Sequence, residues 1–309
     1  MKKETFIFKD KTGLNIFVYK WIPDDNIDIK AVVQIAHGMA ETAARYERLA
    51  EQLTQSGYVV YANDHRGHGK TAKEVDKVGN LGEDGFNNMV QNMHQLEKII
   101  KKENDNIPVY IFGHSMGSFL LQRYICIYGK EISGAILSGT CGKQGMIVDI
   151  GRIIAKREIK KIGRDSRSKK LNNLSFGGYN KVFKPNRTEF DWLSRDEKEV
   201  DKYVKDPYCG GIFTAGFFYD FLGGLKLIAN QKEISNIPKE LPIYIFAGDK
   251  DPVGNRGKGI LKLVKTYKKY KIKDLKYKLY KDGRHEMLNE INRDEVMKDI
   301  IEWLDSHIK

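Results

Sequence analysis

Gly113-His114-Ser115-Met116-Gly117 is the most informative segment of this sequence. It has the pattern G-x-S-x-G, follows the apolar run 109–112, and precedes a helical-looking stretch, 118–125. A serine on so sharp a strand-to-helix turn has a strained backbone and a hydroxyl exposed above the sheet, and the flanking glycines avoid collisions with the neighbouring elements. The context therefore predicts a nucleophilic serine at position 115.

Length and composition are those of a globular protein. The chain has 309 residues, of which 41% are hydrophobic, enough for one large domain with an insertion or for two modest domains. No apolar stretch has the length of a membrane span, and no signal region is visible. Cys126, Cys141 and Cys209 show no C-x-x-C spacing, which indicates reduced thiols, and we expect a cytoplasmic protein.

Strand and helix patterns alternate along most of the chain. An antiparallel hairpin is expected around residues 10–13, between alternating apolar positions. Amphipathic helices are expected at 41–54, 86–102 and 294–307. Continuous apolar runs, typical of buried parallel strands, lie at 31–36, 58–62, 109–112, 134–137 and 243–246. These patterns predict an α/β fold, with a mostly parallel central sheet and helices on both faces.

The alternation is interrupted between residues 141 and 238, where no clear strand pattern occurs. We interpret 141–238 as a mostly helical cap, or lid, inserted into an α/β core formed by 1–140 and 239–309. Its portion 152–187 contains 12 lysines and arginines and only two acidic residues. Its later portion, 212–222, is strongly apolar.

A serine hydroxyl needs a base to accept its proton. His285 lies in the late loop 282–287, after the strand-like run 275–280. In α/β folds with this turn, the order along the chain is serine, acid, histidine, which places the base here. The remaining histidines lie in early loops, in a polar helix, next to Ser115 or on the last helix, at His37, His65, His68, His94, His114 and His307.

The acid that orients the histidine is expected after the strand at 243–246. Asp251 has the spacing G-x-x-D-x-V and is followed by Pro252, whereas Asp249 remains an alternative. Two backbone N–H groups are expected to form the oxyanion hole. One belongs to Met116, directly after the serine, and the other to Met39, in the loop after the strand at 31–36.

Together these motifs resemble a family of serine hydrolases. The resemblance rests on residues 37–41 with Arg45-Tyr46, and on 63–71, 113–117, 248–253 and 283–286, within a match from about residue 4 to 308. It is to the monoacylglycerol lipase and bacterial lysophospholipase group, S33-type serine aminopeptidase-like enzymes of the α/β-hydrolase fold. The resemblance implies Ser115 as nucleophile, Asp251 as acid, His285 as base, Met39 and Met116 as oxyanion donors, and no metal or organic cofactor.

Two polar segments have alternative interpretations. The run 64–71 contains two histidines beside an aspartate, but a structural loop fits better than a metal site, because no further ligand pattern accompanies it. The formal net charge is +12, yet the basic portion 152–187 contains no nucleic-acid-binding motif, so no nucleic-acid partner is expected. This portion is either a solvated face or an amphipathic lid helix that contacts an anionic membrane.

The apolar portion of the cap suggests the substrate. Phe213, Phe217, Phe218 and Leu222 are candidates for an acyl pocket, and the hypothesis is hydrolysis of lysophospholipids or monoacylglycerols through an acyl-enzyme intermediate. Alternatives are a short-chain carboxylesterase, a non-catalytic ligand-binding protein, and a prolyl aminopeptidase-type amide hydrolase. The last would need carboxylates for a substrate ammonium group, for which the candidates are Glu189, Asp191, Asp196 and Glu197. The sequence leaves the head group, the chain length and the oligomeric state open.

Overall fold

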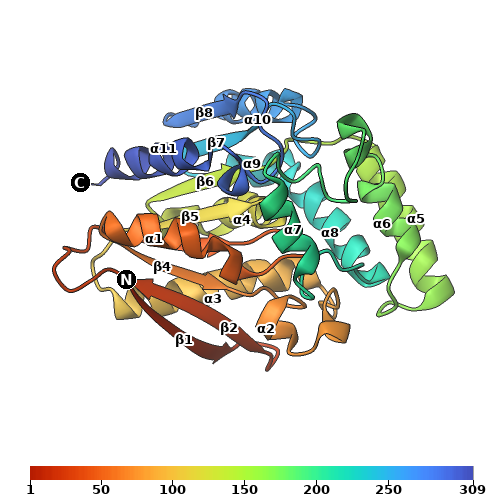
Figure 1. The fold of residues 1–309 in the computed structure, drawn as a ribbon, viewed down its shortest axis with the longest axis horizontal. Coiled ribbons are helices and arrows are strands. Elements are labelled where there is room, and N and C mark those ends of the chain that lie inside the picture. Colours follow the sequence, from red (N-terminus) through yellow and green to blue (C-terminus); the bar gives the residue numbers. More distant parts are fainter. Residues whose placement is uncertain (309) are drawn as a thin grey trace.

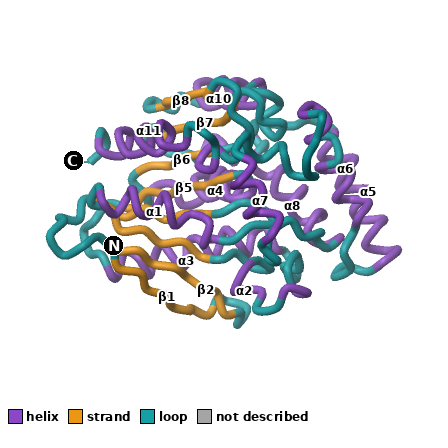
Figure 2. The backbone as a smooth tube through the Cα atoms, viewed as in Figure 1, coloured by secondary structure: helices purple, strands orange, loops and turns teal. Residues whose placement is uncertain are grey.

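A single eight-stranded sheet forms the centre of the computed structural model, which describes residues 1–308 (Figures 1 and 2). The strands are β1 (Lys2–Lys9), β2 (Asn15–Ile22), β3 (Ala31–Ala36), β4 (Tyr58–Asn63), β5 (Val109–His114), β6 (Gly134–Ser138), β7 (Ile243–Gly248) and β8 (Leu275–Tyr280). Their order in the sheet is β1-β2-β4-β3-β5-β6-β7-β8. The β1–β2 hairpin is antiparallel and joins β4 in antiparallel register, and all later pairs are parallel. The predicted α/β fold with a mostly parallel sheet is confirmed.

Helices cover both faces of the sheet. Successive side chains of each strand point to opposite faces, so each central strand contributes to two apolar cores. On one face, residues such as Phe112 pack in a core with α1 (Glu47–Gln55) and α11 (Arg293–Asp305). On the other, residues such as Ile111 pack against α3 (Gly85–Glu103), α4 (Met116–Tyr128) and α10 (Lys258–Lys269). Both faces of the parallel strands are therefore dry, which explains why these strands are continuous apolar runs in the sequence.

The expected helices occur with shifted ends. The segment predicted at 41–54 divides into a 3₁₀ turn, Ala43–Tyr46, and then α1. The helices expected at 86–102 and 294–307 correspond to α3 and α11. A short helix, α2 (Gly69–Ala72), and α10 were not predicted from the sequence.

Five helices occupy the chain between β6 and β7. They are α5 (Ile147–Ile162), α6 (Lys169–Phe176), α7 (Glu197–Lys205), α8 (Ala215–Ile228) and α9 (Gln231–Ser235). In Figure 1, α5 and α6 form the outermost layer at one end of the molecule, with α8 between them and the sheet. A mostly helical cap fits this arrangement, and the cap boundaries at residues 141 and 238 remain a prediction.

Helix α8 packs directly against the helices of the core. A Cβ atom at Gly224 would lie only 2.3 Å from the ring of Phe86 on α3, so the glycine is what lets the two helices approach. Phe217 and Phe218 of α8 are buried in the same apolar cluster as α3 and α4. None of the described helices combines the length and the apolar character needed to cross a bilayer.

Candidate active site

Ser115 lies at the turn between β5 and α4, in a strained conformation. Its φ of 50° and ψ of −117° are unusual for a residue other than glycine. A Cβ atom at Gly113 would lie 2.5 Å from the Gly117 carbonyl oxygen, and one at Gly117 would lie 2.0 Å from that of Ala36. The two flanking glycines therefore permit the turn, as the G-x-S-x-G pattern predicted. The Ser115 N–H donates to the Ser138 carbonyl at 2.9 Å and fixes the turn to β6.

His285 and Asp251 meet in a buried pair below the same edge of the sheet. His285 Nδ1 lies 3.0 Å from Asp251 Oδ1, and both side chains are almost entirely inaccessible to water. The Val253 N–H donates to the same carboxylate oxygen at 2.9 Å and fixes its orientation. A Cβ atom at Gly139 would lie 2.9 Å from the His285 ring, so the absence of a side chain there leaves room for the imidazole.

The pair has the electrostatics of a base held by an acid. Burial alone would lower the pKa of His285, but the charge of Asp251 and its hydrogen bond outweigh burial, and the pKa is raised. Asp249, the alternative acid, has a side chain one-third exposed and lies near Lys250, 3.6 Å away. The hydrogen bond thus favours Asp251 over Asp249 as the partner of His285.

The two predicted oxyanion donors flank the turn. Met116 is the first residue of α4, where backbone N–H groups have no partner within the helix. Met39 lines the cavity next to Ser115, in the loop after β3. That loop is fixed by the Gly38 N–H, which donates to Glu41 Oε1 at 2.5 Å. Met116 is buried in the apolar core and does not line the cavity, so its role as an oxyanion donor remains a prediction.

A cavity of about 630 Å³ opens above Ser115 and His285, both of which line it. Its apolar lining comes from the loop after β3, from α6, from α7 and the segments around it, and from the loop after β7, namely Met39, Phe176, Phe190, Trp192, Leu193, Tyr203, Ile212 and Val253. Its polar lining comes mostly from the cap, namely Lys169, Asn172, Asn173, Asn180, Asn186, Thr188 and Glu189. The cavity thus combines an apolar wall with a polar side that includes both charge signs.

The acyl-pocket candidates lie elsewhere. Phe213, Phe217 and Phe218 are buried in the core, Leu222 packs against it, and none of the four lines the cavity above Ser115. Most of the run at 212–222 belongs to α8, and its side chains are apolar because this helix packs against α3 and α4. This packing corrects the expectation that the run forms an acyl pocket. Ile212, the first residue of the run, does line the cavity. Four aromatic residues that line the cavity were not identified from the sequence, namely Phe176, Phe190, Trp192 and Tyr203.

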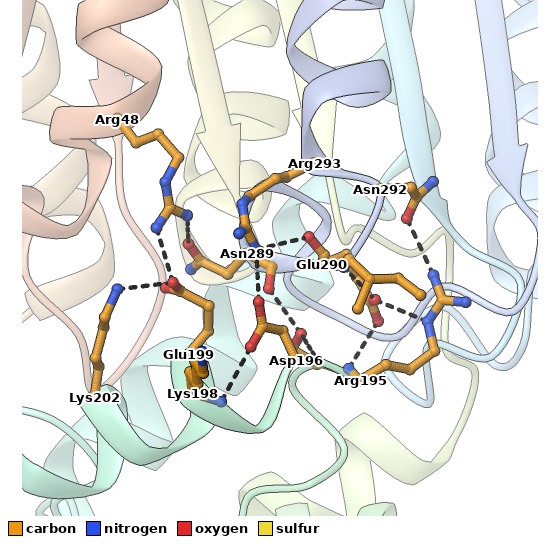
Figure 3. A network of polar contacts seen from close by, with 12 residues as sticks. Arg48, Arg195, Asp196, Lys198, Glu199, Lys202, Asn289, Glu290, Asn292 and Arg293 are labelled. Atoms are coloured by element: carbon orange, nitrogen blue, oxygen red, sulfur yellow. Dashed lines mark hydrogen bonds and ion pairs between the residues drawn. The ribbon is translucent and has the colours of Figure 1, made fainter.

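One segment of the cap is hydrogen-bonded to the loop 282–287, which carries His285 and which we call the histidine loop. We call residues 191–199 the cap strap. Trp192 stands over His285 with 5.0 Å between ring centroids, and the Glu286 N–H donates to the Leu193 carbonyl at 2.8 Å. Figure 3 shows the ion pairs that continue this attachment: Arg195 with Glu290 at 2.8 Å, Arg293 with Asp196 at 2.7 Å, and Arg48 with Glu199 at 2.8 Å. The strap therefore fixes the cavity wall directly above the histidine.

The polar loop at 64–71 is occupied by structural hydrogen bonds. The Asp64 carboxylate accepts from the backbone N–H groups of Ala43 and Lys70, both at 2.8 Å. The rings of His65 and His68 are fully buried beside His37, and burial lowers the pKa of His68 to about 4. Elsewhere in the described chain, His94, Glu97 and Glu131 have a spacing that a metal ion could bridge. There, Lys101 Nζ lies 2.6 Å from Glu97 and already supplies a positive charge.

A mostly parallel sheet, a serine on the strand-to-helix turn, and a buried histidine–carboxylate pair at the same sheet edge define an α/β-hydrolase. The comparison with known proteins agrees. Residues 27–292 match the family model described as serine aminopeptidase, S33, and the chain belongs to this family. The chain is therefore a hydrolase.

Individual relatives cover nearly the whole chain. It is 28% identical over 306 residues to the monoacylglycerol lipase of Mycolicibacterium smegmatis, covering 96% of this chain and 95% of the relative. It is 26% identical over 304 residues to the monoglyceride lipase of Rattus norvegicus, covering 96% and 88%. Among solved structures, a thermostable carboxyl esterase from Bacillus coagulans, in complex with glycerol, superposes with a TM-score of 0.92 at 29% identity, with full coverage of both chains.

The His285–Asp251 pair predicts the pH dependence. With His285 as the predicted base, only its neutral form is active, so the rate should fall as the pH drops through its raised pKa, on the alkaline side of 6.5. We expect Asp251→Asn to reduce kcat by about 10³–10⁴-fold and to move the acid limb to lower pH, because the main opposition to the effect of burial on the His285 pKa is then removed. Asp249→Asn is the matched control and should leave the limb in place. A pH profile of ester hydrolysis in which Asp249→Asn, and not Asp251→Asn, shifts the limb would reverse the assignment.

Proposed function

We propose that this chain hydrolyses the ester bond of monoacyl lipids, with Ser115 as nucleophile, Asp251 as acid and His285 as base. The observation that supports it most is the position of Ser115 and His285 in one cavity with an aromatic wall, with Asp251 3.0 Å behind the imidazole. The names of the relatives, a monoacylglycerol lipase and a monoglyceride lipase, point to the same substrate class.

The reaction follows from these positions. His285 Nε2 accepts the proton of the Ser115 hydroxyl as Oγ attacks the ester carbonyl carbon, and the carbonyl oxygen becomes an oxyanion held by the N–H groups of Met39 and Met116. The C–O bond to the head group then breaks, and His285 gives its proton to the departing alkoxide. Water, deprotonated by His285, then attacks the carbonyl carbon of the acyl-serine. The bond to Ser115 Oγ breaks, His285 returns the proton to Oγ, and the fatty acid is released. Asp251 keeps the imidazole oriented and stabilises its charged form.

The carboxylates of the cap favour an ester over a peptide substrate. Asp191 accepts hydrogen bonds from the Thr188 hydroxyl and backbone, Asp196 pairs with Arg293, and Glu197 lies 3.7 Å from Arg187. Of the four candidates for binding a substrate ammonium group, only Glu189 lines the cavity, and its side chain is largely exposed at the mouth. An aminopeptidase would need such carboxylates aimed at the substrate.

The cavity fits an amphipathic substrate. Each methylene group that it removes from water contributes about 0.8 kcal/mol, so an acyl chain is favoured along the aromatic wall. Lys169 and the asparagines that line the same cavity can donate hydrogen bonds to the oxygens of a glycerol or phosphoglycerol head group.

The deciding experiment measures fatty-acid release from a monoacylglycerol and from a lysophospholipid, with a short p-nitrophenyl ester alongside. Wild-type protein is expected to prefer the long-chain substrates, and Ser115→Ala to abolish hydrolysis of all three. The ratio of the two long-chain rates assigns the head group. Hydrolysis of the short ester alone would support a short-chain carboxylesterase, and unchanged activity in Ser115→Ala would exclude the serine mechanism.

The aromatic wall makes a second prediction. Phe176 lines the cavity and lies beside Trp192, with 6.4 Å between ring centroids. Phe176→Ala should raise KM for long-chain esters about tenfold or more and leave the short ester nearly unchanged, because part of the apolar contact is lost. Phe221→Ala is the matched control, since Phe221 packs on the core and does not line the cavity. Equal effects on both chain lengths would place the acyl chain elsewhere.

We also propose that the outer cap helices contact anionic membranes. Four apolar side chains at the start of α5, Met146, Ile147, Ile150 and Ile153, have 55–80% of their surface exposed, and Leu174 of α6 is 63% exposed. Exposed cations follow on α5, namely Lys156, Arg157, Lys160 and Lys161. The acidic residues of the helix are paired, Asp149 with Lys226 and Glu158 with Lys170. An exposed apolar strip beside unpaired positive charge is typical of helices that lie on anionic lipid.

Vesicle binding tests this contact. Sedimentation with vesicles of phosphatidylglycerol and phosphatidylcholine should recover the protein, and high salt or pure phosphatidylcholine should weaken recovery. Replacing both Ile147 and Ile150 by Asp should reduce the partition coefficient at least about tenfold, while hydrolysis of a short soluble ester persists. Ile7→Asp is the matched control, because Ile7 is 56% exposed on β1, at the other end of the molecule (Figure 1). Equal loss in Ile7→Asp would show that the effect is general.

A further inference from the structure

Arg45 lies between the two loops that the proposed reaction needs. Its Nη1 contacts Glu41 Oε2 at 2.6 Å, in the loop after β3. The same guanidinium binds both carboxylate oxygens of Glu286, Nη1 to Oε1 at 2.7 Å and Nη2 to Oε2 at 2.6 Å. Glu286 is 241 residues away in the sequence and directly follows His285. One side chain thus connects the histidine loop to the loop after β3, which contains Met39 and which we call the oxyanion loop.

The Glu41 end of this connection acts on the oxyanion loop. Glu41 Oε1 accepts from the Gly38 N–H at 2.5 Å and from the Tyr46 hydroxyl at 2.8 Å. Gly38 precedes Met39, so the orientation of the Met39 peptide depends on where the Glu41 carboxylate is held. A Cβ atom at Gly38 would lie 2.6 Å from Glu41 Oε1 and 3.2 Å from the Ser115 Cβ atom. The backbone of this loop therefore packs directly between the carboxylate and the serine.

The Glu286 end acts on the histidine. The Glu286 carboxylate also accepts from Asn289 Nδ2 at 2.9 Å, and its backbone N–H is bound to Leu193 in the cap strap. Glu286 is therefore held through both its side chain and its backbone. These contacts also restrain the backbone of the adjacent His285. The loop that presents the imidazole is therefore fixed from the Arg45 side and from the cap side.

Charge balance makes Arg45 indispensable to this arrangement. Glu41 and Glu286 are both more than nine-tenths buried, and two carboxylates in one dry region repel each other. Burial raises the pKa of Glu286, but the Arg45 guanidinium overcomes this and holds it at about 2. Burial dominates at Glu41 and raises its pKa, although Arg45 opposes the rise. Without the guanidinium, at least one of the two carboxylates would have no counter-charge.

We propose that Arg45 is a positioning residue that sets the separation between the Met39 N–H and the His285 imidazole. The inference rests on the proposed serine mechanism, and it adds a residue that touches neither the substrate nor the triad. The planar fork of arginine matches the two oxygens of Glu286 while the same Nη1 reaches Glu41. Lysine has the charge but not the fork, so it cannot hold both loops at once.

The test compares Arg45→Lys with Arg66→Lys. Arg66 is also a buried, ion-paired arginine, but it contacts Asp10, Thr12 and Leu81 near the first hairpin and does not line the cavity. Two readouts are needed: kcat and KM for a short ester, and the rate at which a fluorophosphonate labels Ser115. Labelling forms a tetrahedral phosphorus adduct and so reports the base and the oxyanion hole together. Thermal unfolding of each variant reports the structural effect alone.

For Arg45→Lys we expect kcat and the labelling rate to fall on the order of 10–100-fold, with KM within about threefold of wild type. For Arg66→Lys we expect a lower unfolding temperature with near wild-type kcat and labelling. Glu286→Gln keeps the guanidinium and its contact with Glu41 but replaces one of the two acceptor oxygens of the fork by an NH2 group, and it should show a smaller loss than Arg45→Lys with the acid limb of the pH profile moved to lower pH. This second variant also keeps the test decisive if Arg45→Lys does not fold.

The outcomes separate this inference from the function on which it rests. A folded Arg45→Lys protein that is labelled at the wild-type rate, or a Glu286→Gln protein with wild-type kcat and pH profile, would overturn the role of Arg45 and leave the serine mechanism standing. Equal kcat losses in Arg45→Lys and Arg66→Lys would also overturn it, since the effect would then be general destabilisation. Wild-type protein that is not labelled at Ser115 would overturn the proposed function itself.

Discussion

The contact between Gly117 and the end of β3 is the constraint on which the rest of the site depends. A side chain at position 117 would collide with the carbonyl oxygens of Ala36 and His37, so only glycine lets α4 begin this close to the strand. That approach brings the turn at Ser115 and the loop at Met39 to the same sheet edge. Because β5 and β3 are neighbours in parallel register, the two predicted oxyanion donors come from adjacent strand ends.

Ion pairs are the second feature that organises the structure, and they are unevenly distributed over it. The buried Glu41–Arg45–Glu286 ion pairs and the partly buried strap pairs of Arg195 and Arg293 lie around the histidine loop. Exposed pairs contribute little to stability, but a buried charge that loses its partner costs several kcal/mol. The loop that presents His285 is therefore stabilised by contacts that only one geometry satisfies.

Much of this architecture could be predicted from the sequence, and the part that could not depends on long-range contacts. Strands buried on both faces are continuous apolar runs, and the spacing around Ser115, Asp251 and His285 is local information. The run at 212–222 looks the same whether it lines a cavity or packs on α3, and the contact of Gly224 with Phe86 decides between them. Arg45 is visible in the sequence as part of a motif, but its partner Glu286 is 241 residues away.

The cap divides into two parts with different attachments, and this division bears on how a lipid substrate is handled. Trp192 and Leu193 belong to the strap and are hydrogen-bonded through their backbones to the histidine loop, so the wall above His285 is continuous with the catalytic loop. Phe176, whose ring lies beside that of Trp192, comes instead from α6 in the outer layer, whose exposed surface is apolar and basic. Under the proposed function, the strap supports the reacting ester at His285, and the acyl chain lies along the aromatic wall that Phe176 of α6 completes. Separate segments therefore serve the two needs. The strap gives the rigid support that the reaction needs, and the outer helices give the exposed apolar surface that lipid binding needs.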